Sequence, residues 1–569
     1  MNKTAQRVKG VLFAMIFLAG AALVFWKCRF GFANIDETFY LTIPYRLTQG
    51  DGLFVHEWHL SQMGGFLLYP FMLLYRWIHP DTAGIVLWFR YLYAVLHTGG
   101  ALLIWYRLRR QGGWGLGAAL LYLLFAPYGI MALSYNSMGV ACVTLSAVLL
   151  ATNSTNRRTV WFIAGLLWAA AVLCCPYLAG GYLLFAVGCL VVWILAARFP
   201  QKLPDGRTSL PMLAWVTAGC AALAVVFLAF VFSRATLSEL LTALPQILDD
   251  PEHPSVGFAE AVLRYLYWIW HSNARTPLAL GIGAVLAAVI LLDRRPGWRR
   301  YLYGTMALLL AAWFGLPFLQ GTPVLNYLMF PVAYLGLFAF LLAPAQNGKL
   351  FLFPWLGGVL YSFCVSWSSN QGFFVISMAM TASAVASCAM VGNWLAGWCS
   401  LPACRPARLL RLIACGMLAV FLLVEGRTRY ETLFWEYAGM DGMTSQIQNG
   451  PEKGLWVSAT AWGDYEGMYA DVESLWQQGQ GPVLCYTNHT FPYLCSELPM
   501  GSFSAWLGGT GPVSFAKLQA YYQLNPDKFP AAAYCFKSDA FAVEALRGML
   551  EPLGYTYTET EKGFLFTAP

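Results

Sequence analysis

Two adjacent carboxylates, Asp36 and Glu37, come directly after the first long apolar segment of the chain. They stand in the stretch Asn34-Ile35-Asp36-Glu37-Thr38-Phe39-Tyr40. A carboxylate at a membrane surface can accept a proton from an incoming hydroxyl group, and partial burial raises its pKa toward the range that such chemistry needs. The pair therefore indicates chemistry on a lipid-borne substrate. The plainer interpretation is the solvated start of a loop.

Further ionisable and polar residues gather in two long segments of the sequence. The first segment, 31–83, contains Asp36, Glu37, Arg46, Asp51, His56, Glu57, His59, Ser61 and Gln62. The second segment, 233–276, contains Glu239, Asp249, Asp250, Glu252, His253, Arg264, His271 and Arg275. We expect both segments on the outer face of a membrane, as two walls of one cavity.

The cluster His56-Glu57-Trp58-His59 also raises the question of a metal. Its two histidines are three residues apart, which does not match the helical H-E-x-x-H zinc motif, and no third ligand is evident. A divalent cation held by Asp36, Glu57 or His59 is one alternative. The group 249–253 (Asp-Asp-Pro-Glu-His) is a second source of carboxylates, but this pattern is also ordinary turn chemistry.

The composition defines the elements that must hold these residues in place. The chain has 569 residues, of which 59% are hydrophobic and 11% are charged, and its mean hydropathy is +0.56. This composition excludes a single soluble globule and predicts a polytopic α-helical membrane protein. Lys3, Arg7 and Lys9 precede the first apolar run, and no small-residue cleavage site follows it. We interpret this run as a retained span with a cytoplasmic N-terminus.

Twelve further spans bring the expected number of transmembrane helices to about thirteen. They lie near 84–106, 114–133, 137–152, 159–176, 178–197, 210–232, 276–292, 302–320, 325–344, 350–367, 371–397 and 407–425. Alternate loops contain the basic residues, namely Arg107, Arg109, Arg110, Arg157, Arg158, Lys202, Arg207, Arg294, Arg295, Arg299, Arg300, Lys349, Arg405, Arg408 and Arg411. This asymmetry follows the positive-inside rule and places the chain after Glu425 outside. The net charge of +7 is therefore largely a topology signal and does not favour a nucleic-acid partner.

One apolar run does not fit as a span. The segment Gly64 to Ile78 is short, contains Pro70 and is rich in aromatic residues. If it crossed the membrane, the later basic loops would all change sides. We therefore expect a helix that lies in the outer interface.

From residue 426 to 569 the composition becomes that of a soluble domain. We expect strands at 454–460, 482–487 and 531–536, helices at 465–478 and 541–553, and a closing hairpin at 555–566, which together make an α/β domain. The glycine-rich stretch 506–511 lacks the context of a nucleotide-binding loop, so we expect an ordinary loop there. Cys485, Cys495 and Cys535 lie in this domain, and a disulfide between Cys485 and Cys495 or free thiols are both open.

The order of these features resembles the GT-C superfamily of membrane glycosyltransferases, particularly the branch of protein O-mannosyltransferases and lipid A aminoarabinose transferases. The resemblance is best over the first 160 residues, and its matches are Asp36-Glu37 followed by Tyr40, the stretch Pro44 to Asp51 (Pro-Tyr-Arg-Leu-Thr-Gln-Gly-Asp), the segment Phe66 to Ile78, and Arg90 in Trp88-Phe89-Arg90-Tyr91-Leu92. The resemblance implies inverting transfer of a sugar from a polyprenyl-phosphate donor to a lipid, glycan or protein acceptor at the outer face.

This resemblance also implies roles for single residues. Asp36 would be the base, with Glu37 supporting it or positioning the acceptor. Arg46, Arg90, Arg264 and Arg275 are the candidates for the donor phosphate, because a guanidinium binds phosphate oxygens in a bidentate manner. The aminoarabinose branch has a lysine before the interfacial helix, whereas this chain reads Val55-His56-Glu57-Trp58-His59-Leu60-Ser61-Gln62. His56, Glu57, His59 and Gln62 are therefore further candidates for binding substrate.

Two other classes of function stay open at this point. A transporter or flippase of a lipid-linked or cell-envelope precursor would place ionisable residues near the middle of several spans, and it would often show inverted repeats, which are not evident here. A non-catalytic envelope scaffold would leave the acidic pair without a role. Replacement of Asp36 discriminates between these classes and the transferase.

Overall fold

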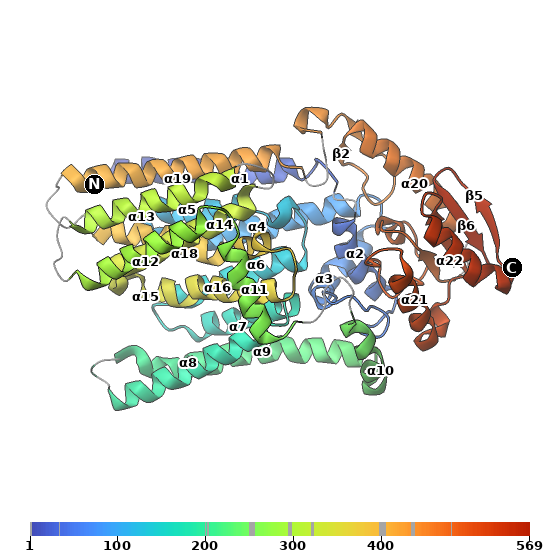
Figure 1. Cartoon of the computed structure of the whole chain (residues 1–569), viewed down its shortest axis with the longest axis horizontal. Helices are drawn as coiled ribbons and strands as arrows, with labels where there is room; N and C mark the ends of the chain where they lie inside the picture. Colours follow the sequence, from blue (N-terminus) through green and yellow to red (C-terminus); the bar gives the residue numbers. More distant parts are fainter. Residues whose placement is uncertain are drawn as a thin grey trace.

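The computed structural model shows an elongated molecule with the helical bundle at one end and the sheet-containing domain at the other (Figure 1). The structure describes residues 3–32, 35–199, 201, 204–249, 256–293, 299–319, 324–397, 405–433, 438–478 and 481–569. The two chain termini lie at opposite ends of the longest axis (Figure 1). The predicted class, a polytopic helical protein with a C-terminal α/β domain, is confirmed.

The bundle is built from long apolar helices. Eight helical segments among the described residues are long and apolar enough to cross a membrane. They are built on α1 (Lys3–Lys27), α4 (Ile85–Leu108), α6 (Tyr135–Thr152), α8 (Leu178–Arg198), α9 (Ser209–Phe232), α13 (Arg299–Gly315), α15 (Pro344–Leu350) with α16 (Leu356–Trp367), and α19 (Arg405–Glu431). The predicted spans at these places are helices, as expected.

The remaining predicted spans are shorter or broken helices. The shorter ones are α5 (Gly113–Leu124), α7 (Arg158–Cys174), α12 (Thr276–Leu292) and α14 (Val324–Leu342). Helices α17 (Phe373–Ala379) and α18 (Thr381–Gly397) are long enough to cross a membrane only when they are taken together. The chain bends by 51° at the break between them. The number of thirteen crossings stays a prediction.

The span predicted at 114–133 is wrong in its second half. Helix α5 ends at Leu124, and the backbone from Phe125 to Ser134 forms an irregular turn on the way to α6. Pro127 explains the early end, because proline lacks the N–H group that would continue the helix and disfavours a helical conformation in the residue before it. The turn places Tyr128 at the end of the bundle that meets α2, where a continuous span would not have placed it.

The segment between α1 and α4 contains two helices that lie between the bundle and the C-terminal domain (Figure 1). They are α2 (Asp36–Thr48) and α3 (Met63–Ile78), and α3 matches the helix expected at 64–78. The two helices approach closely at Gly65, where an added Cβ would lie 2.3 Å from Ile43 Cγ2. Eleven residues of α2, Glu37 to Leu47, are buried, so this helix is a core element and not a surface one.

Helices α10 (Leu237–Leu248) and α11 (Phe258–Trp270) lie in the second outer segment. Both are amphipathic, with Ala243 and Ile247 of α10 buried against the C-terminal domain. The predicted residues Asp250, Glu252 and His253 lie outside the described residues.

The C-terminal domain has a four-stranded sheet in the order β3-β4-β6-β5. Its strands are β3 (Val483–Cys485), β4 (Ala532–Phe536), β5 (Thr556–Glu559) and β6 (Gly563–Thr567), and a separate hairpin pairs β1 (Ser445–Gln446) with β2 (Trp456–Val457). The β3–β4 pair is parallel and the others are antiparallel. Helices α20 (Ala459–Gln478), α21 (Pro512–Leu524) and α22 (Ala540–Leu550) accompany the sheet. The predicted strands are present but shorter, except that the last strand of the hairpin reaches Thr567. Helix α22 is shorter than predicted, whereas α20 begins six residues earlier, at Ala459, and α21 was not predicted.

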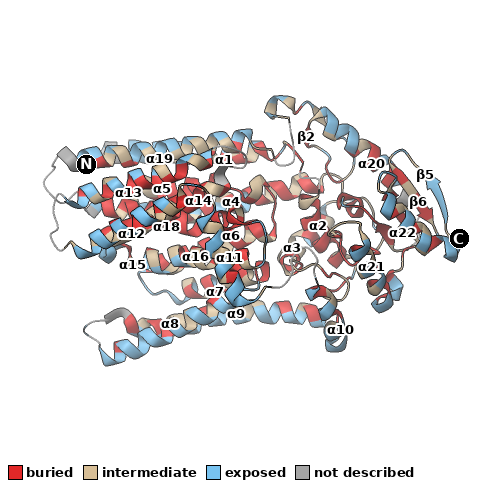
Figure 2. Ribbon diagram, in the orientation of Figure 1, coloured by how far each residue is buried: buried red, intermediate tan, exposed pale blue. Residues whose placement is uncertain are grey.

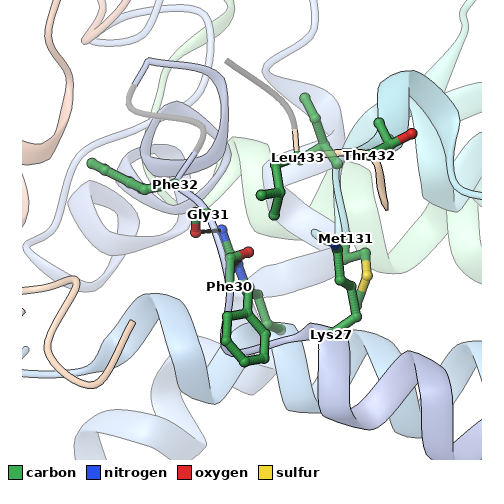
Figure 3. A pocket seen from close by; sticks show the side chains of 10 residues that line it. Lys27, Phe30, Gly31, Phe32, Met131, Thr432 and Leu433 are labelled. Atoms are coloured by element: carbon green, nitrogen blue, oxygen red, sulfur yellow. Dashed lines mark hydrogen bonds between the residues drawn. The ribbon is translucent and has the colours of Figure 1, made fainter. Parts of the chain in front are cut away.

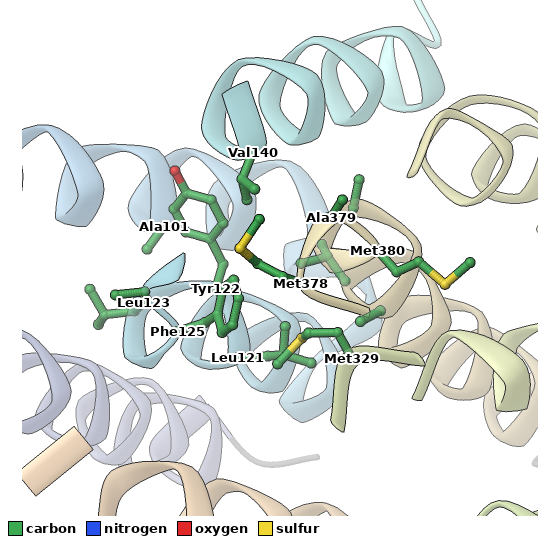
Figure 4. Packing of buried hydrophobic residues seen from close by; sticks show 14 of the residues in the cluster. Ala101, Leu121, Tyr122, Leu123, Phe125, Val140, Met329, Met378, Ala379 and Met380 are labelled. Atoms are coloured by element: carbon green, nitrogen blue, oxygen red, sulfur yellow. The ribbon is translucent and has the colours of Figure 1, made fainter. Parts of the chain in front are cut away.

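The buried residues form three clusters that follow this architecture. The largest one fills the bundle, where side chains such as Tyr122, Phe125 and Met378 interlock (Figure 4). Many residues on the outer surface of the bundle are exposed and apolar, as expected for contact with lipid (Figure 2). The second cluster joins α2 to the sheet, and the third one fills the C-terminal domain. No disulfide joins cysteines among the described residues, so the bond considered between Cys485 and Cys495 is not formed.

Candidate active site

The C-terminal domain is docked directly on the helix that begins with the acidic pair. The Oγ1 atoms of Thr38 and Thr490 lie 2.6 Å apart, and Thr490 Oγ1 also donates to the carbonyl oxygen of Ile35 at 2.8 Å. Both threonines are fully buried. The N-terminal turn of α2 is therefore enclosed between the bundle and this domain, and Asp36 lies at the edge of that enclosure.

Glu37 is bound in a buried ion pair with Arg90 of α4. Its two carboxylate oxygens accept from Arg90 Nε at 2.5 Å and from Nη2 at 2.6 Å. The guanidinium also donates to three backbone carbonyl oxygens at the end of α1 and just after it, those of Cys28, Phe30 and Gly31. A guanidinium has five N–H groups. All five N–H groups of Arg90 are thus used within the protein, which ties α4, α1 and α2 together.

Asp36 differs from Glu37 in its exposure. Asp36 is half-buried, whereas Glu37 is only 1% exposed. Asp36 and Tyr40 are four residues apart on α2 and so lie on one face of it. The ring of Tyr40 packs edge-on against that of Tyr135, with centroids 5.8 Å apart. Burial, followed by the negative charge of Asp36, raises the pKa of Tyr40 well above its usual value.

A second buried ion network surrounds Arg46. Its Nε donates to Asp51 Oδ2 and its Nη1 donates to Glu57 Oε2, both at 2.8 Å, while Lys528 of the C-terminal domain lies 2.5 Å from Asp51 Oδ1. Burial acts to raise the pKa of Asp51, but Arg46 and Lys528 outweigh it and hold this pKa below its usual value. Burial raises the pKa of Glu57. The four charges balance one another, so this network fixes the domain on α2.

His56, His59 and Gln62 hold the loop between α2 and α3 in shape. His56 Nδ1 accepts from the backbone N–H of Gly52 at 2.9 Å, and His59 Nδ1 lies 2.8 Å from Ser61 Oγ. Gln62 Oε1 accepts from the N–H of Phe54 at 2.6 Å, and Phe54 has a positive φ of 68°. In the part of the chain that the structure describes, no group of three or more His, Cys, Asp or Glu residues is arranged to hold a metal ion.

Arg264 and Arg275 contact a different part of the bundle. Arg264 Nη2 donates to the carbonyl oxygens of Ser366 and Trp367, at the end of α16. Arg275 donates to the carbonyl oxygen of Trp313 in α13 and lies over its ring. The structure thus brings Asp36, Glu37 and Arg90 together, joins Arg46 to Glu57, and binds Arg264 and Arg275 to other helix ends.

Arg234 is a residue of the outer segment that the sequence analysis missed. It follows the end of α9 and donates to the carbonyl oxygens of Leu47 and Asp51 at 2.6 and 2.8 Å, and to Tyr69 Oη at 2.9 Å. Its guanidinium is half-buried and stacks over the ring of Phe230. The signal in the sequence was a basic residue two positions after a lipid-facing span.

A small pocket lies between the end of α1 and the end of α19. Figure 3 shows its lining, in which Lys27 and the chain up to Phe32 face Met131, Thr432 and Leu433. The pocket has a volume of about 20 Å³, which is room for one water molecule and too little for a sugar ring. Its lining also includes Arg90, whose donors are all used. This pocket beside the Glu37–Arg90 pair is therefore too small to be the site of a sugar.

No protein-family model matches this chain, and no curated protein matches it. Among solved structures it is similar to ArnT from Cupriavidus metallidurans bound to undecaprenyl phosphate, with 13% identity and a TM-score of 0.46 over 98% of this chain and 99% of that chain. It is also similar to the archaeal oligosaccharyltransferase AglB from Archaeoglobus fulgidus, in complex with an inhibitory peptide and a dolichol-phosphate. That match has 11% identity and a TM-score of 0.40 over 99% of this chain and 74% of that chain. Both proteins are GT-C superfamily members, the superfamily that the sequence resembles. At these TM-scores the likeness assigns no activity to this chain.

Proposed function

We propose that this protein is a membrane glycosyltransferase that moves a sugar from a polyprenyl-phosphate donor to an acceptor at the outer face of the membrane. The observation that carries the proposal is the different environment of the two adjacent carboxylates. Arg90 neutralises Glu37 in a buried pair, while the neighbouring Asp36 stays half-exposed at the edge of the enclosure. Glu37 and Arg90 hold the turn in place, and Asp36 is the base.

The reaction needs one base and one place for negative charge. The acceptor hydroxyl oxygen attacks the anomeric carbon, its proton passes to Asp36, and the bond from that carbon to the phosphate oxygen breaks with inversion. The polyprenyl phosphate then leaves with the bonding electron pair. A nearby cation stabilises the charge that grows on the phosphate.

Arg234 is the cation that we propose for the donor phosphate. Two of its five N–H groups have no partner among the described residues, its side chain is half-buried, and it stands at the outer end of α9, a helix largely exposed to lipid. Arg90 has no free donor, and Arg46 is matched by two carboxylates. Arg264 and Arg275 are the alternatives from the same outer segment. The leaving group of the proposed donor, a polyprenyl phosphate, is of the class bound in the two similar structures.

Transfer of labelled sugar from a panel of polyprenyl-phosphate donors tests the proposal. We expect the wild-type protein to give a product of inverted configuration and Asp36→Asn to give none. Glu544→Gln is the matched control, because Glu544 is an exposed carboxylate on α22. Activity that survives in Asp36→Asn would contradict the role of this residue.

One observation favours a second candidate, a transporter or flippase of a lipid-linked precursor. Glu425 of α19 is fully buried inside a span, and neither of its carboxylate oxygens has a hydrogen-bond partner among the described residues. Ionisable groups inside spans often mark transport pathways. Movement of a labelled lipid-linked sugar across proteoliposomes, lost in Glu425→Gln and kept in Asp36→Asn, would support this candidate.

A further inference from the structure

Tyr128 has a backbone conformation that bulky residues avoid. It lies in the turn between α5 and α6 with φ 58° and ψ 0°, in the left-handed region. This conformation costs free energy for a residue that has a Cβ atom, and such strain persists only where the surroundings impose it. A glycine, as at the next position, would relieve the strain. The conformation thus points to a use for the tyrosine side chain at this place.

Contacts to two other elements impose this conformation. The N–H group of Tyr128 donates to Oδ1 of Asn326, a fully buried residue of α14, at 3.1 Å. Its phenol group donates to Oε1 of Gln371, in the loop between α16 and α17, at 2.6 Å. The ring packs against Phe374, with centroids 5.1 Å apart. The tyrosine therefore bridges parts of the bundle that are about 200 residues and more apart in the sequence.

Tyr128 also packs against the helix that carries the candidate base. It contacts the buried cluster of the bundle and the one that joins α2 to the sheet, and the latter contains Tyr40, one turn after Asp36 on α2. Burial, followed by the charges of Tyr135 and Asp36, raises the pKa of Tyr128 well above its usual value, so its hydroxyl keeps its proton. The same two groups, Tyr135 and Asp36, raise the pKa of Tyr40. Tyr128 is thus a residue of the bundle turn that packs against the cluster around Tyr40 of α2.

The hydroxyl group of Tyr128 and the amide group of Gln371 can together bind the hydroxyls of a sugar. Because the phenol proton is given to Gln371 Oε1, the lone pairs of Tyr128 Oη are left to accept a hydrogen bond. The Gln371 side chain is exposed, and its NH₂ group can donate. A sugar presents neighbouring hydroxyls, each of which both donates and accepts. An acceptor and a donor side by side fit two such hydroxyls.

We propose that Tyr128 and Gln371 form a sugar-binding subsite beside Asp36, which holds two neighbouring hydroxyls of the transferred sugar. This inference rests on the proposed function and deepens it. It makes Tyr128 and Gln371 specificity-determining residues, and it explains why a strained tyrosine stands where glycine would be less costly. It also assigns one wall of the site to the short turn 125–134 and the loop 368–372.

Deoxy-sugar donors test the subsite. With the wild-type protein, the donor that lacks the hydroxyl bound by Tyr128 should have a kcat/KM about tenfold lower than the natural donor. This factor corresponds to the loss of one hydrogen bond. In Tyr128→Phe the natural donor should lose the same factor, and the deoxy donor should lose nothing further. Gln371→Leu should show the same pattern for the adjacent hydroxyl. Tyr182→Phe is the matched control, because the Tyr182 hydroxyl bonds Thr217 between α8 and α9.

The outcomes separate this inference from the proposed function. Transfer by the wild-type protein with an equal loss for every deoxy donor in Tyr128→Phe would overturn the subsite and keep the transferase. If the wild-type protein transfers no sugar, the proposed transferase function is contradicted. Binding of methyl glycosides, measured by saturation-transfer NMR, then tests the subsite by itself. A signal that Tyr128→Phe loses and Tyr182→Phe keeps supports it. Equal signals in the two variants, or no signal in the wild-type protein, overturn it.

Discussion

Glu452 gives a prediction whose size follows from its burial. It lies in the turn before β2, where the carbonyl oxygens of Gly450 and Pro451 accept from the N–H groups of Gly84 and Val86 at the start of α4. The residue is fully buried, and its carboxylate oxygens have no hydrogen-bond partner among the described residues. Burial raises the pKa of Glu452 from 4.5 to about 8. The folded protein therefore keeps this carboxyl protonated at neutral pH.

The sign of the pH dependence follows from this shift. Above pH 4.5 the unfolded chain releases the proton while the folded protein retains it, so the contribution of Glu452 to stability falls as the pH rises to about 8 and is constant beyond. At about 1.4 kcal/mol per pH unit, the loss is about 3 kcal/mol at pH 7 and about 5 kcal/mol at pH 9. Glu452→Gln cannot ionise and does not incur this loss.

We therefore expect Glu452→Gln to be more stable than the wild-type protein at pH 7 and pH 9, and nearly equal to it at pH 5. Thermal unfolding of the purified proteins in detergent at the three pH values measures this difference. The exposed variant Glu544→Gln should show no such trend. A difference that is the same at all three values, or a wild-type protein that is the more stable one at pH 9, would refute the reasoning.

Three substitutions test the contacts that hold the site together. Arg90→Gln leaves the carboxylate of Glu37 buried without its partner, which should cost about 3–5 kcal/mol and show as a lower folded yield in size-exclusion profiles. Gly65→Ala should cost about 1–3 kcal/mol in thermal unfolding, because its new methyl group overlaps the neighbouring helix, whereas Gly281→Ala meets no atom within 4 Å. Lys528→Met removes a charge pair between the C-terminal domain and the segment after α2, so limited proteolysis should release that domain faster than in the wild-type protein.

The apolar spans were predictable from the sequence because the bilayer imposes a length and a composition on each of them. Helix α3 was predictable as a separate short helix, since counting it as a span would have reversed every later basic loop. Its position in the membrane interface stays a prediction. The end of α5 was not predicted, although Pro127 marks it. The prediction of a span at 114–133 followed the long run of apolar residues and did not take account of this single proline. The order of strands and helices in the C-terminal domain followed from alternation and turn residues, while α21 lacks a strong amphipathic pattern.

The candidate site was predictable only in part. The polar residues of 31–83 were recognised as a group, but their pairing depends on contacts across long sequence separations. Arg90 meets Glu37 from 53 residues away, and Lys528 meets Asp51 from 477 residues away. Ion pairs between residues so far apart produce no periodic pattern in a single sequence, so they could not be predicted from it. The strained conformation of Tyr128 is likewise set by Asn326 and Gln371, which no local rule connects to it.

The central claim is that Asp36 is the base of a glycosyl transfer and that Glu37 is not. The most direct measurement is the turnover rate with a saturating polyprenyl-phosphate sugar for the wild-type protein and Asp36→Asn, at equal folded amounts. Removal of a general base should lower this rate by about 10²–10⁴-fold and leave donor binding within about threefold. Equal turnover in the two proteins would contradict the account.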